Sequence, residues 1–246
     1  QSNVLNLSKN HYIVGPRYGN LDIGDKGLGR LIEPDELLGV LNKQKGKIIV
    51  TSGPTYEEID DVKVVTNKSS GKQGRALAIE LSARGYEIIY IHSASIDHIP
   101  GLDNVSFHSS NDLKIKILEN INNTDAIFMT AAVSDFTVKK SSGKISRSNG
   151  NITLEFIPNE DIIATIKTSY PEIKCIAFSA QVDDELNFNK INTKNVDYLV
   201  INNILKNNFG SDANKVSIID HQHLIFESEE LDKNEISRDI LNALEY

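Results

Sequence analysis

The feature that most constrains the fold is a regular alternation of short apolar runs with amphipathic segments, which begins at Lys47. The apolar runs are rich in β-branched residues and predict strands, while apolar residues at three- and four-residue spacing predict helices. Strands joined by helices favour right-handed crossovers and a mainly parallel sheet. We therefore expect a Rossmann-like three-layer α/β/α sandwich with a C-terminal β-hairpin. The predicted strands are 47–51, 87–92, 125–133, 152–156, 174–180 and 198–201, with a hairpin at 216–219 and 224–226; the predicted helices are 34–42, 75–84, 112–120, 161–168, 184–195 and 229–244.

Residues 1–46 have a different character from the rest of the chain. Glycine and proline are dense between Gly15 and Pro34, which is typical of loops and turns. A short helix at 34–42 places Leu37, Leu38 and Leu41 on one face. A segment this small cannot bury a core of its own. We therefore expect residues 1–46 to pack on the main domain, residues 47–246, or to belong to a domain that lies outside this chain.

The charge and cysteine content exclude several classes of protein. The 26 basic and 34 acidic residues give a net charge of −8, which argues against a nucleic-acid or membrane-surface partner. The single cysteine, Cys175, excludes an internal disulfide framework. No apolar run is long enough to predict a membrane span. These features predict a cytoplasmic protein.

Two glycine-containing stretches follow the first predicted strand and predict an anion site. They are 53–55 (Gly-Pro-Thr) and 69–74 (Ser-Ser-Gly-Lys-Gln-Gly), and the second opens a helix. Small residues let backbone N–H groups approach a phosphate, and a helix N-terminus favours negative charge. Ligands of such sheets lie beyond the carboxyl ends of the strands. The alternative is that these glycines only turn the chain.

The common dinucleotide and phosphate fingerprints are absent. No Gly-x-Gly-x-x-Gly follows the first strand, and there is no Gly-x-x-x-x-Gly-Lys-Ser/Thr motif. Tyr170 and Lys174 have the Tyr-x-x-x-Lys spacing of short-chain dehydrogenases, but Pro171 disfavours helix at Tyr170. An NAD(P)-dependent oxidoreductase is therefore the weaker alternative among enzymes, and a non-catalytic nucleotide-binding domain is the alternative outside them.

A basic stretch follows the predicted strand 125–133. Lys139, Lys140, Lys144 and Arg147 lie in a polar segment without an acidic residue. A cationic loop at the carboxyl end of a strand could close over a polyphosphate. A solvated surface loop explains the same residues.

Several further polar residues lie near predicted strand ends. Asp135 could bind a nucleotide hydroxyl or Mg²⁺, or cap a turn. Lys190 and Lys194 share one helical face, where they could contact phosphate or simply face solvent. Asn202 could orient a ligand or cap a turn.

Taken in order, these stretches resemble the phosphopantothenate–cysteine ligase family across residues 47–246. The resemblance implies a ligase that activates the carboxylate of 4'-phosphopantothenate with a nucleoside triphosphate, usually CTP, and Mg²⁺. Cysteine then displaces the nucleotide, and the products are phosphopantothenoylcysteine, CMP and pyrophosphate. Family members are homodimers with the substrate site near the subunit interface. The motifs are Thr51–Thr55, Ile59–Lys63, Thr66–Gly74, Ala131–Phe136, Lys144–Arg147, Asn159–Ile162, Phe178–Ala180, Lys190 with Lys194, and Phe209–Asn214.

The resemblance also implies roles for individual residues. Asn67 matches an asparagine that holds the acyl intermediate, and Lys144 matches a lysine of a mobile loop beside the acyl phosphate. Gln181 and Lys63 replace a family glutamate and arginine, and the basic loop has one positive charge fewer. The implied nucleotide-binding residues are Gly53, Met129, Thr130, Ala131, Asp135, Lys144, Glu160, Asp161, Ile162, Ile163, Phe178, Lys190 and Lys194, and the implied substrate-binding residues are Asn67, Ser69, Ser70, Gly71, Lys72 and Ala132.

Residues 1–46 resemble the tail of the decarboxylase domain that many bacteria fuse ahead of the ligase. Gly15-Pro16, Gly24-Asp25 and Glu33-Pro34 carry this match. Ile23 stands where that family has its catalytic cysteine, and the flavin-binding body of the domain is not in this chain. We therefore expect neither FMN binding nor decarboxylation from this chain.

Overall fold

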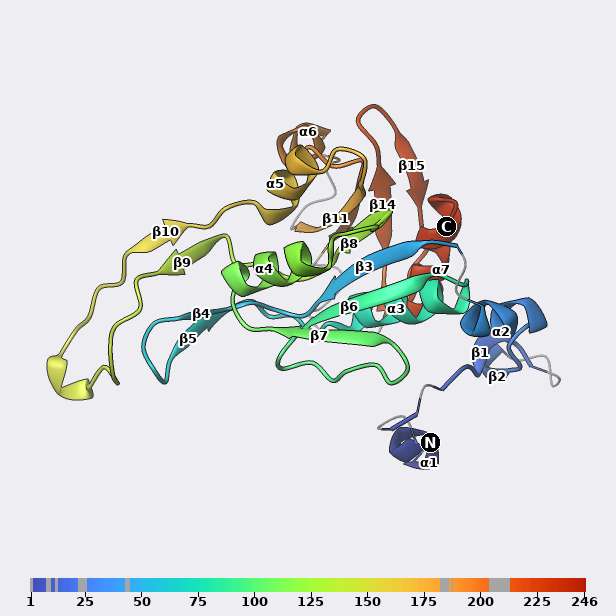
Figure 1. Cartoon of the computed structure of the whole chain (residues 1–246), viewed down its shortest axis with the longest axis horizontal. Coiled ribbons are helices and arrows are strands. Elements are labelled where there is room, and N and C mark those ends of the chain that lie inside the picture. The colour runs from blue at the N-terminus through green and yellow to red at the C-terminus, as the bar shows by residue number, and fades with distance from the viewer. Residues whose placement is uncertain are drawn as a thin grey trace.

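The computed structural model describes residues 2–7, 10–11, 13–21, 26–42, 45–181, 186, 188–203 and 213–246. Its centre is an eight-stranded sheet with helices on both faces (Figure 1). The strands of that sheet are β3 (Lys47–Ser52), β6 (Glu87–Ser93), β7 (Asp103–Phe107), β8 (Ala126–Met129), β11 (Lys174–Gln181), β12 (Tyr198–Asn203), β14 (Val216–Ile219) and β15 (Leu224–Glu227). The helices of the domain are α3 (Lys72–Ala83), α4 (Ser110–Asn120), α5 (Ile162–Ser169), α6 (Phe188–Lys194) and α7 (Lys233–Ala243).

The strand order confirms the predicted Rossmann-like sheet. From one edge it runs β7-β6-β3-β8-β11-β12, all parallel, and the antiparallel hairpin β14–β15 completes the other edge. The chain winds outward from β3 in both directions, so β3 and β8 flank the point where the winding reverses. In open α/β sheets, this point is where ligands bind.

The two faces of the sheet form two apolar cores because successive side chains of a strand point to opposite faces. On β3, Ile48 and Val50 pack with α3 and α7, while Ile49 packs with α4, α5 and α6 on the other side. All three side chains are fully buried. The near-continuous apolar run of this strand therefore reflects burial on both faces.

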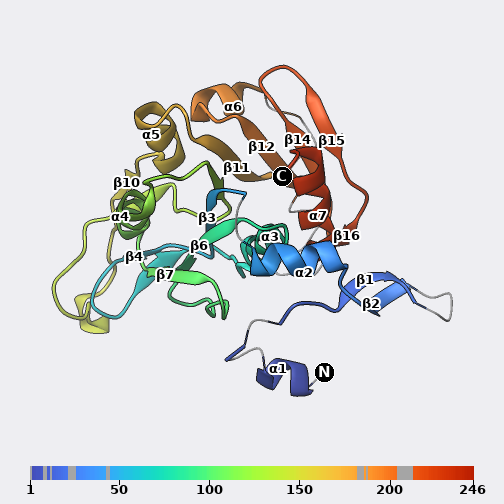
Figure 2. The same cartoon turned by 45° about the vertical axis from the view of Figure 1, so that its right-hand side comes forward.

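The N-terminal segment packs on the main domain, as one of the two sequence expectations stated. It contains α1 (Ser2–Leu7), the hairpin of β1 (Arg17–Asn20) and β2 (Lys26–Arg30), and α2 (Pro34–Leu41). Figure 2 shows α2 beside α3, and Lys45 N–H donates to the Gly85 carbonyl just beyond α3. The leucine face of α2 points away from that contact, because Leu38 and Leu41 are 58% and 75% exposed.

A two-layered arm extends from the sheet on the side of β7 (Figure 1). One layer pairs β4 (Tyr56–Glu58) with β5 (Val64–Thr66), and the other pairs β9 (Phe136–Val138) with β10 (Phe156–Pro158). The short 3-10 helix η1 (Arg147–Asn149) lies between β9 and β10 in the chain. A last small pair joins β13 (Ala213–Asn214) to β16 (Leu231–Asp232).

Three sequence expectations about elements were wrong. The predicted strand 125–133 ends at Met129, because beyond this residue side-chain hydrogen bonds replace the backbone hydrogen bonds between strands. The predicted half-buried strand 152–156 is a strand only from Phe156, and Ile152 is 48% exposed. The last helix begins at Lys233 rather than residue 229, because the Asp232 side chain caps the N–H groups of Asn234 and Glu235. No helix among the described residues is long and apolar enough to cross a membrane.

Candidate functional site

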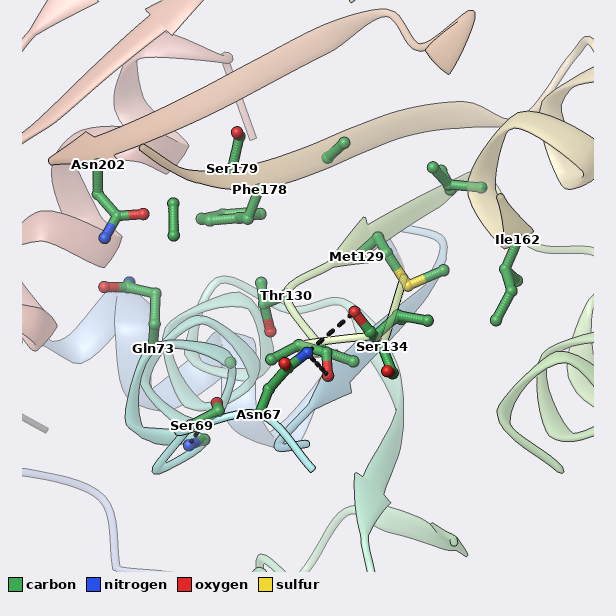
Figure 3. A pocket seen from close by; sticks show the side chains of 18 of the residues that line it. Asn67, Ser69, Gln73, Met129, Thr130, Ser134, Ile162, Phe178, Ser179 and Asn202 are labelled. Carbon is green, nitrogen blue, oxygen red and sulfur yellow. Dashed lines mark hydrogen bonds between the residues drawn. The ribbon is translucent and has the colours of Figure 1, made fainter. Parts of the chain in front are cut away.

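A cavity of about 660 Å³ opens beyond the carboxyl ends of β8 and β11, beside the reversal point of the sheet. Figure 3 shows side chains from both halves of the sheet converging on it. Its walls come from the 67–74 loop and the start of α3, the chain after β8, the start of α5, α6, and the start of α7. The lining residues are Asn67–Gly74, Met129–Asp135, Asn159–Ile163, Ala177–Ala180, Lys190, Lys194, Asn202, Asn214, Val216 and Lys233.

The start of α3 is held tightly against the ends of β3 and β8. Ser52 Oγ donates to the Gly71 carbonyl at 2.8 Å. A Cβ at Gly74 would lie 2.8 Å from both Ser52 Cβ and Ser52 Oγ and would also meet Thr130, so only glycine allows this approach. The first turn of α3 therefore faces the cavity, and the N-terminus of a helix favours an anion.

Asn67 crosses from this loop to the chain after β8. Its Nδ2 donates to the carbonyls of Ala132 and Val133 at 3.1 and 3.0 Å (Figure 3). Because both amide hydrogens are used, the side chain is oriented and its Oδ1 is the atom left to accept a hydrogen bond.

The chain after β8 is fixed by hydroxyl groups of the β3 side. Thr51 Oγ1 accepts from Ala131 N–H at 3.1 Å, and Thr55 Oγ1 accepts from Ser134 N–H at 3.0 Å. Thr130 Oγ1 donates to the Thr51 carbonyl. These bonds explain why β8 stops at Met129 and why the next residues form a rigid wall.

The α5 and α6 side of the cavity carries paired charges. Lys194 Nζ lies 2.7 Å from Asp161 Oδ2, while Asp161 Oδ1 caps α5 through Ala164 N–H. Lys190 Nζ donates to Ser179 Oγ at 2.7 Å. This side therefore presents two ammonium groups and a helix N-terminus, which together favour an anion.

Two further carboxylates line the cavity and differ in their partners. Glu160 accepts from Lys114 and Thr165, and the Lys114 hydrogen bond in particular lowers the pKa of Glu160. Asp135 has no side-chain hydrogen bond or ion pair among the described residues; only its carbonyl is used, by Asn159 N–H at 2.8 Å. The Asp135 carboxylate is thus available to a ligand.

The described residues contain no cluster of three His, Cys, Asp or Glu side chains that could hold a metal ion. Mg²⁺ commonly binds through one or two carboxylates together with the phosphates of a substrate. Asp135 is a carboxylate of this kind, so the residues present fit a Mg²⁺ that arrives with a nucleotide.

The structure brings together all the site residues singled out from the sequence except Gly53 and Lys144. Gly53 has φ +88° and lies below the cavity, where a Cβ would come within 2.7 Å of Ser93 and Ile96. Its carbonyl accepts from Ala132 N–H at 2.9 Å. Gly53 therefore supports the wall after β8 and is not among the residues that line the cavity; its contact with a nucleotide stays a prediction.

Lys144 lies at the tip of the arm, beside a separate hollow that it lines with Lys63 and Arg147. Asp60 holds this tip in place: it accepts from Lys63 Nζ and from the N–H groups of Lys63, Val62 and Ile145. The Lys63 hydrogen bond contributes most to a pKa of Asp60 far below the usual range. The basic loop is therefore held at the arm tip by Asp60, and Lys144 does not line the cavity of its own chain.

Sequence reasoning missed several residues that line the cavity. Lys233 and Asn214 enter it from the C-terminal part of the chain, and Gln73 enters it from α3. Asn159 also holds the Asp135 loop, because its Nδ2 donates to the Ser134 carbonyl at 2.9 Å. Asn159, Gln73 and Asn214 carried usable signals, because they lie in the Asn159–Ile162, 69–74 and Phe209–Asn214 stretches, whereas Lys233 carried none. Residues 209–212 of the Phe209–Asn214 motif lie outside the described residues.

Comparison with known proteins identifies the family. The model of the DNA/pantothenate metabolism flavoprotein C-terminal domain matches residues 43–246. The chain belongs to this family. The match confirms the resemblance found in the sequence and starts close to the expected boundary at residue 47.

Curated relatives of the family extend the comparison. The chain is 33% identical over 234 residues to the coenzyme A biosynthesis bifunctional protein CoaBC of Bacillus subtilis, covering 88% of this chain and 58% of that protein. It is 28% identical to CoaBC of Haemophilus influenzae, and the match covers 99% of this chain and 64% of that protein. A cysteine/cysteine sulfinic acid decarboxylase of an unknown prokaryotic organism is 30% identical, with 98% and 72% covered. The chain thus spans less than two thirds of these CoaBC relatives.

Solved structures share the fold. The DNA/pantothenate metabolism flavoprotein from Streptococcus pneumoniae superposes with a TM-score of 0.70 at 23% identity, covering 81% of this chain and 98% of that one. The C-terminal domain of CoaBC superposes with a TM-score of 0.69 at 28% identity, covering 82% and 95%. A variant of Cab2 in complex with phosphopantothenate-cysteine gives a TM-score of 0.64 at 16% identity, covering 85% and 90%.

Proposed function

We propose that the cavity is the active site of a ligase that joins 4'-phosphopantothenate to L-cysteine in coenzyme A biosynthesis. The observation that carries the proposal is that the 67–74 loop, Asp135 and Lys190 line a single cavity. The family and its CoaBC relatives support the pathway, and the phosphopantothenate-cysteine complex of a structural neighbour supports the product class. The energy source we propose is CTP.

The reaction proceeds in two displacements. A carboxylate oxygen of 4'-phosphopantothenate attacks the α-phosphorus of CTP and pyrophosphate leaves, which gives an acyl-cytidylate. The amine of cysteine then attacks the acyl carbon, CMP leaves with the bonding electron pair, and the amine gives up a proton. Positioning and charge stabilisation provide most of the catalysis in phosphoryl transfer.

The proposed roles follow the two sides of the cavity. The nucleotide binds against the chain after β8, Phe178 and the start of α5, where Lys190 and Lys194 offset phosphate charge. The substrate binds along the 69–72 loop, with the Asn67 Oδ1 facing the acyl group. Asp135, together with the triphosphate, would hold Mg²⁺, which would supply positive charge beside the phosphates.

The placement of Lys144 supports a homodimer in which the arm of one subunit completes the site of the other. Phe136, Phe156 and Ile157 on the arm are 46%, 49% and 45% exposed, which is apolar surface suited to a partner. In this arrangement, Lys144 contacts the acyl phosphate in the cavity of the partner subunit. A lysine there stabilises the charge that develops at the α-phosphorus.

The reaction is tested by incubating the protein with CTP, Mg²⁺, cysteine and 4'-phosphopantothenate and measuring pyrophosphate. Release should require 4'-phosphopantothenate and should be faster with CTP than with ATP. Nucleotide binding without release would support a non-catalytic domain instead, and release that ignores 4'-phosphopantothenate would refute the ligase.

The dimer is tested by mixing two inactive variants, Asn67→Asp and Lys144→Gln. If Lys144 acts on the partner, a mixed dimer contains one site with both native residues, and activity should return to about a quarter of wild type on random mixing. Each variant alone, mixed with itself, is the control. Sedimentation as a monomer, or no recovery on mixing, would refute the shared site.

A further inference from the structure

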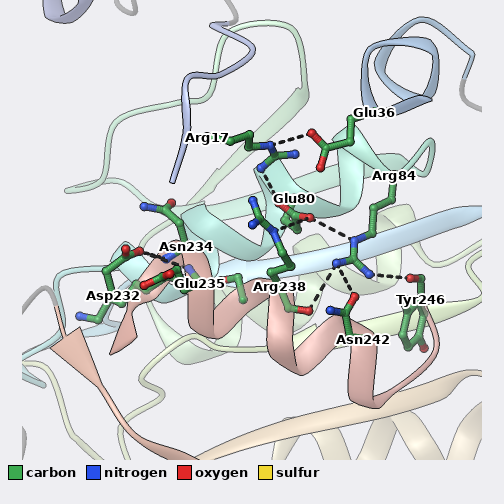
Figure 4. Close-up of polar contacts among 12 residues, drawn as sticks. Arg17, Glu36, Glu80, Arg84, Asp232, Asn234, Glu235, Arg238, Asn242 and Tyr246 are labelled. Carbon is green, nitrogen blue, oxygen red and sulfur yellow. Dashed lines mark hydrogen bonds and ion pairs between the residues drawn. The ribbon is translucent and has the colours of Figure 1, made fainter. Parts of the chain in front are cut away.

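The N-terminal segment is joined to the main domain by a buried cluster of charges around Glu80 (Figure 4). Glu80 projects from the C-terminal half of α3 and is 4% exposed. Arg17, from β1, places Nη1 2.5 Å from Glu80 Oε2 and Nε 2.9 Å from Glu36 of α2. Both carboxylates raise the pKa of Arg17 against the lowering effect of its burial, so this guanidinium remains charged.

The same carboxylate also joins α3 to α7. Arg84 Nε lies 3.2 Å from Glu80 Oε1, and Arg238 Nε of α7 lies 3.8 Å from it. Arg84 continues the connection by donating to the Asn242 side chain and to the Tyr246 carbonyl, at 2.9 and 2.8 Å. One buried carboxylate therefore holds arginines from three parts of the chain.

The seam between α3 and α7 leads from this cluster to the cavity. Two turns before Glu80, Gln73 Nε2 donates to the buried hydroxyl of Ser237 at 2.8 Å. Gln73 lines the cavity beside Lys72, and Lys233 at the start of α7 lines it as well. A rigid helix transmits a shift at one end to the other, so the cluster at the far end of the seam can set where these residues stand.

We propose that Arg17 is a positioning residue for the active site, because it joins Arg84 and Arg238 in offsetting the charge of Glu80 and so helps to fix the α3–α7 seam, whose cavity end carries Lys72, Gln73 and Lys233. Arg17 lies outside residues 43–246, which the family model covers. The N-terminal segment is thereby a working part of the site rather than an attached tail. This inference rests on the proposed function only for the identity of the substrate.

The first test is amide hydrogen exchange of the full chain without any ligand, comparing wild type with Arg17→Met. The matched control is Arg30→Met, which removes a pair with Glu33 at an exposed position of the same segment. We expect faster exchange in Arg17→Met at residues 75–78 and in the first turns of α7, and no such change in the control. Changes confined to residues 13–42 and 80–84 would overturn the proposal.

The second test separates positioning from folding by kinetics. A misplacement near 1 Å can cost a large factor in rate, and α3 lines the substrate side of the cavity. Arg17→Met should therefore raise KM for 4'-phosphopantothenate about five- to tenfold while KM for CTP changes less than twofold. Arg17→Lys, with a single point charge, should recover part of the loss. An equal fall in activity at all substrate concentrations would indicate a smaller amount of folded enzyme and would refute the positioning role of Arg17. A wild type without turnover would refute the ligase and leave the exchange test decisive.

Discussion

Replacing Gly74 with alanine should destabilise the protein, although Gly→Ala inside a helix is normally stabilising. The usual gain in helix propensity is about 1 kcal/mol. Here the added Cβ would lie 2.8 Å from Ser52 and would also meet Thr130. Overpacking of this kind costs about 1–3 kcal/mol, and because the Cβ would meet Ser52 and Thr130 at once, we expect the upper part of that range, about 2–3 kcal/mol. We expect a net loss of about 1 to 2 kcal/mol in the free energy of unfolding.

Urea unfolding measures this loss directly. With a slope of about 2 kcal/mol per molar urea, the midpoint should fall by about 0.5–1 M. The first turn of α3 must also move away from β3, so nucleotide and substrate binding should weaken together. A Gly74→Ala variant with a higher midpoint than wild type would refute the packing argument.

Three other predictions follow from single contacts. Burial raises the pKa of the Cys175 thiol to about 12, so Ellman's reagent should react with this thiol at pH 8 only after denaturation. Because the folded pKa exceeds the unfolded pKa, the free energy of unfolding should fall as the pH rises from about 8.5 to the folded pKa. Asp60→Asn should speed amide exchange at Lys63 and Ile145, whose N–H groups donate to Asp60, without changing exchange in α3. Unchanged exchange would remove Asp60 as the anchor of the arm tip. Lys194→Met should weaken CTP binding, measured by calorimetry, more than it weakens 4'-phosphopantothenate binding.

Local sequence signals predicted β3, β6, β8, β11 and β12 of the parallel sheet because each of these strands is marked by its own apolar residues. The edge strand β7 was missed because most of its residues are polar or only partly buried. The apolar run at the first strand reflects burial on both faces, and Pro171 ends α5 at Ser169 before the chain enters β11. Tyr170 and Lys174 consequently lie on different elements, as their context predicted. The position of the cavity followed from the same logic, since the carboxyl ends of parallel strands share one edge of the sheet.

The arm and the N-terminal hairpin could not be predicted in this way. β9 and β10 have three residues each and bury only Val138 among them, which is too little for an alternating pattern to mark either strand. The glycine-rich sequence of β2 reads as loop. Lys144 was placed beside the bound phosphates by the basic stretch after a predicted strand and by the resemblance, whereas the fold of a single chain puts it at the arm tip. Lys233 was missed because tertiary packing, not spacing, brings α7 to the cavity.

The walls of the cavity come from residues as far apart as Asn67 and Lys233, and neighbouring strands such as β3 and β8 are separated by a long stretch of chain. Contacts between residues far apart in the sequence slow folding, because the chain loses the entropy of loop closure before these contacts can stabilise it. The binding site should therefore mature only in the final folding phase, after the local helices. During synthesis on a ribosome, the cavity would stay incomplete until α7 has emerged.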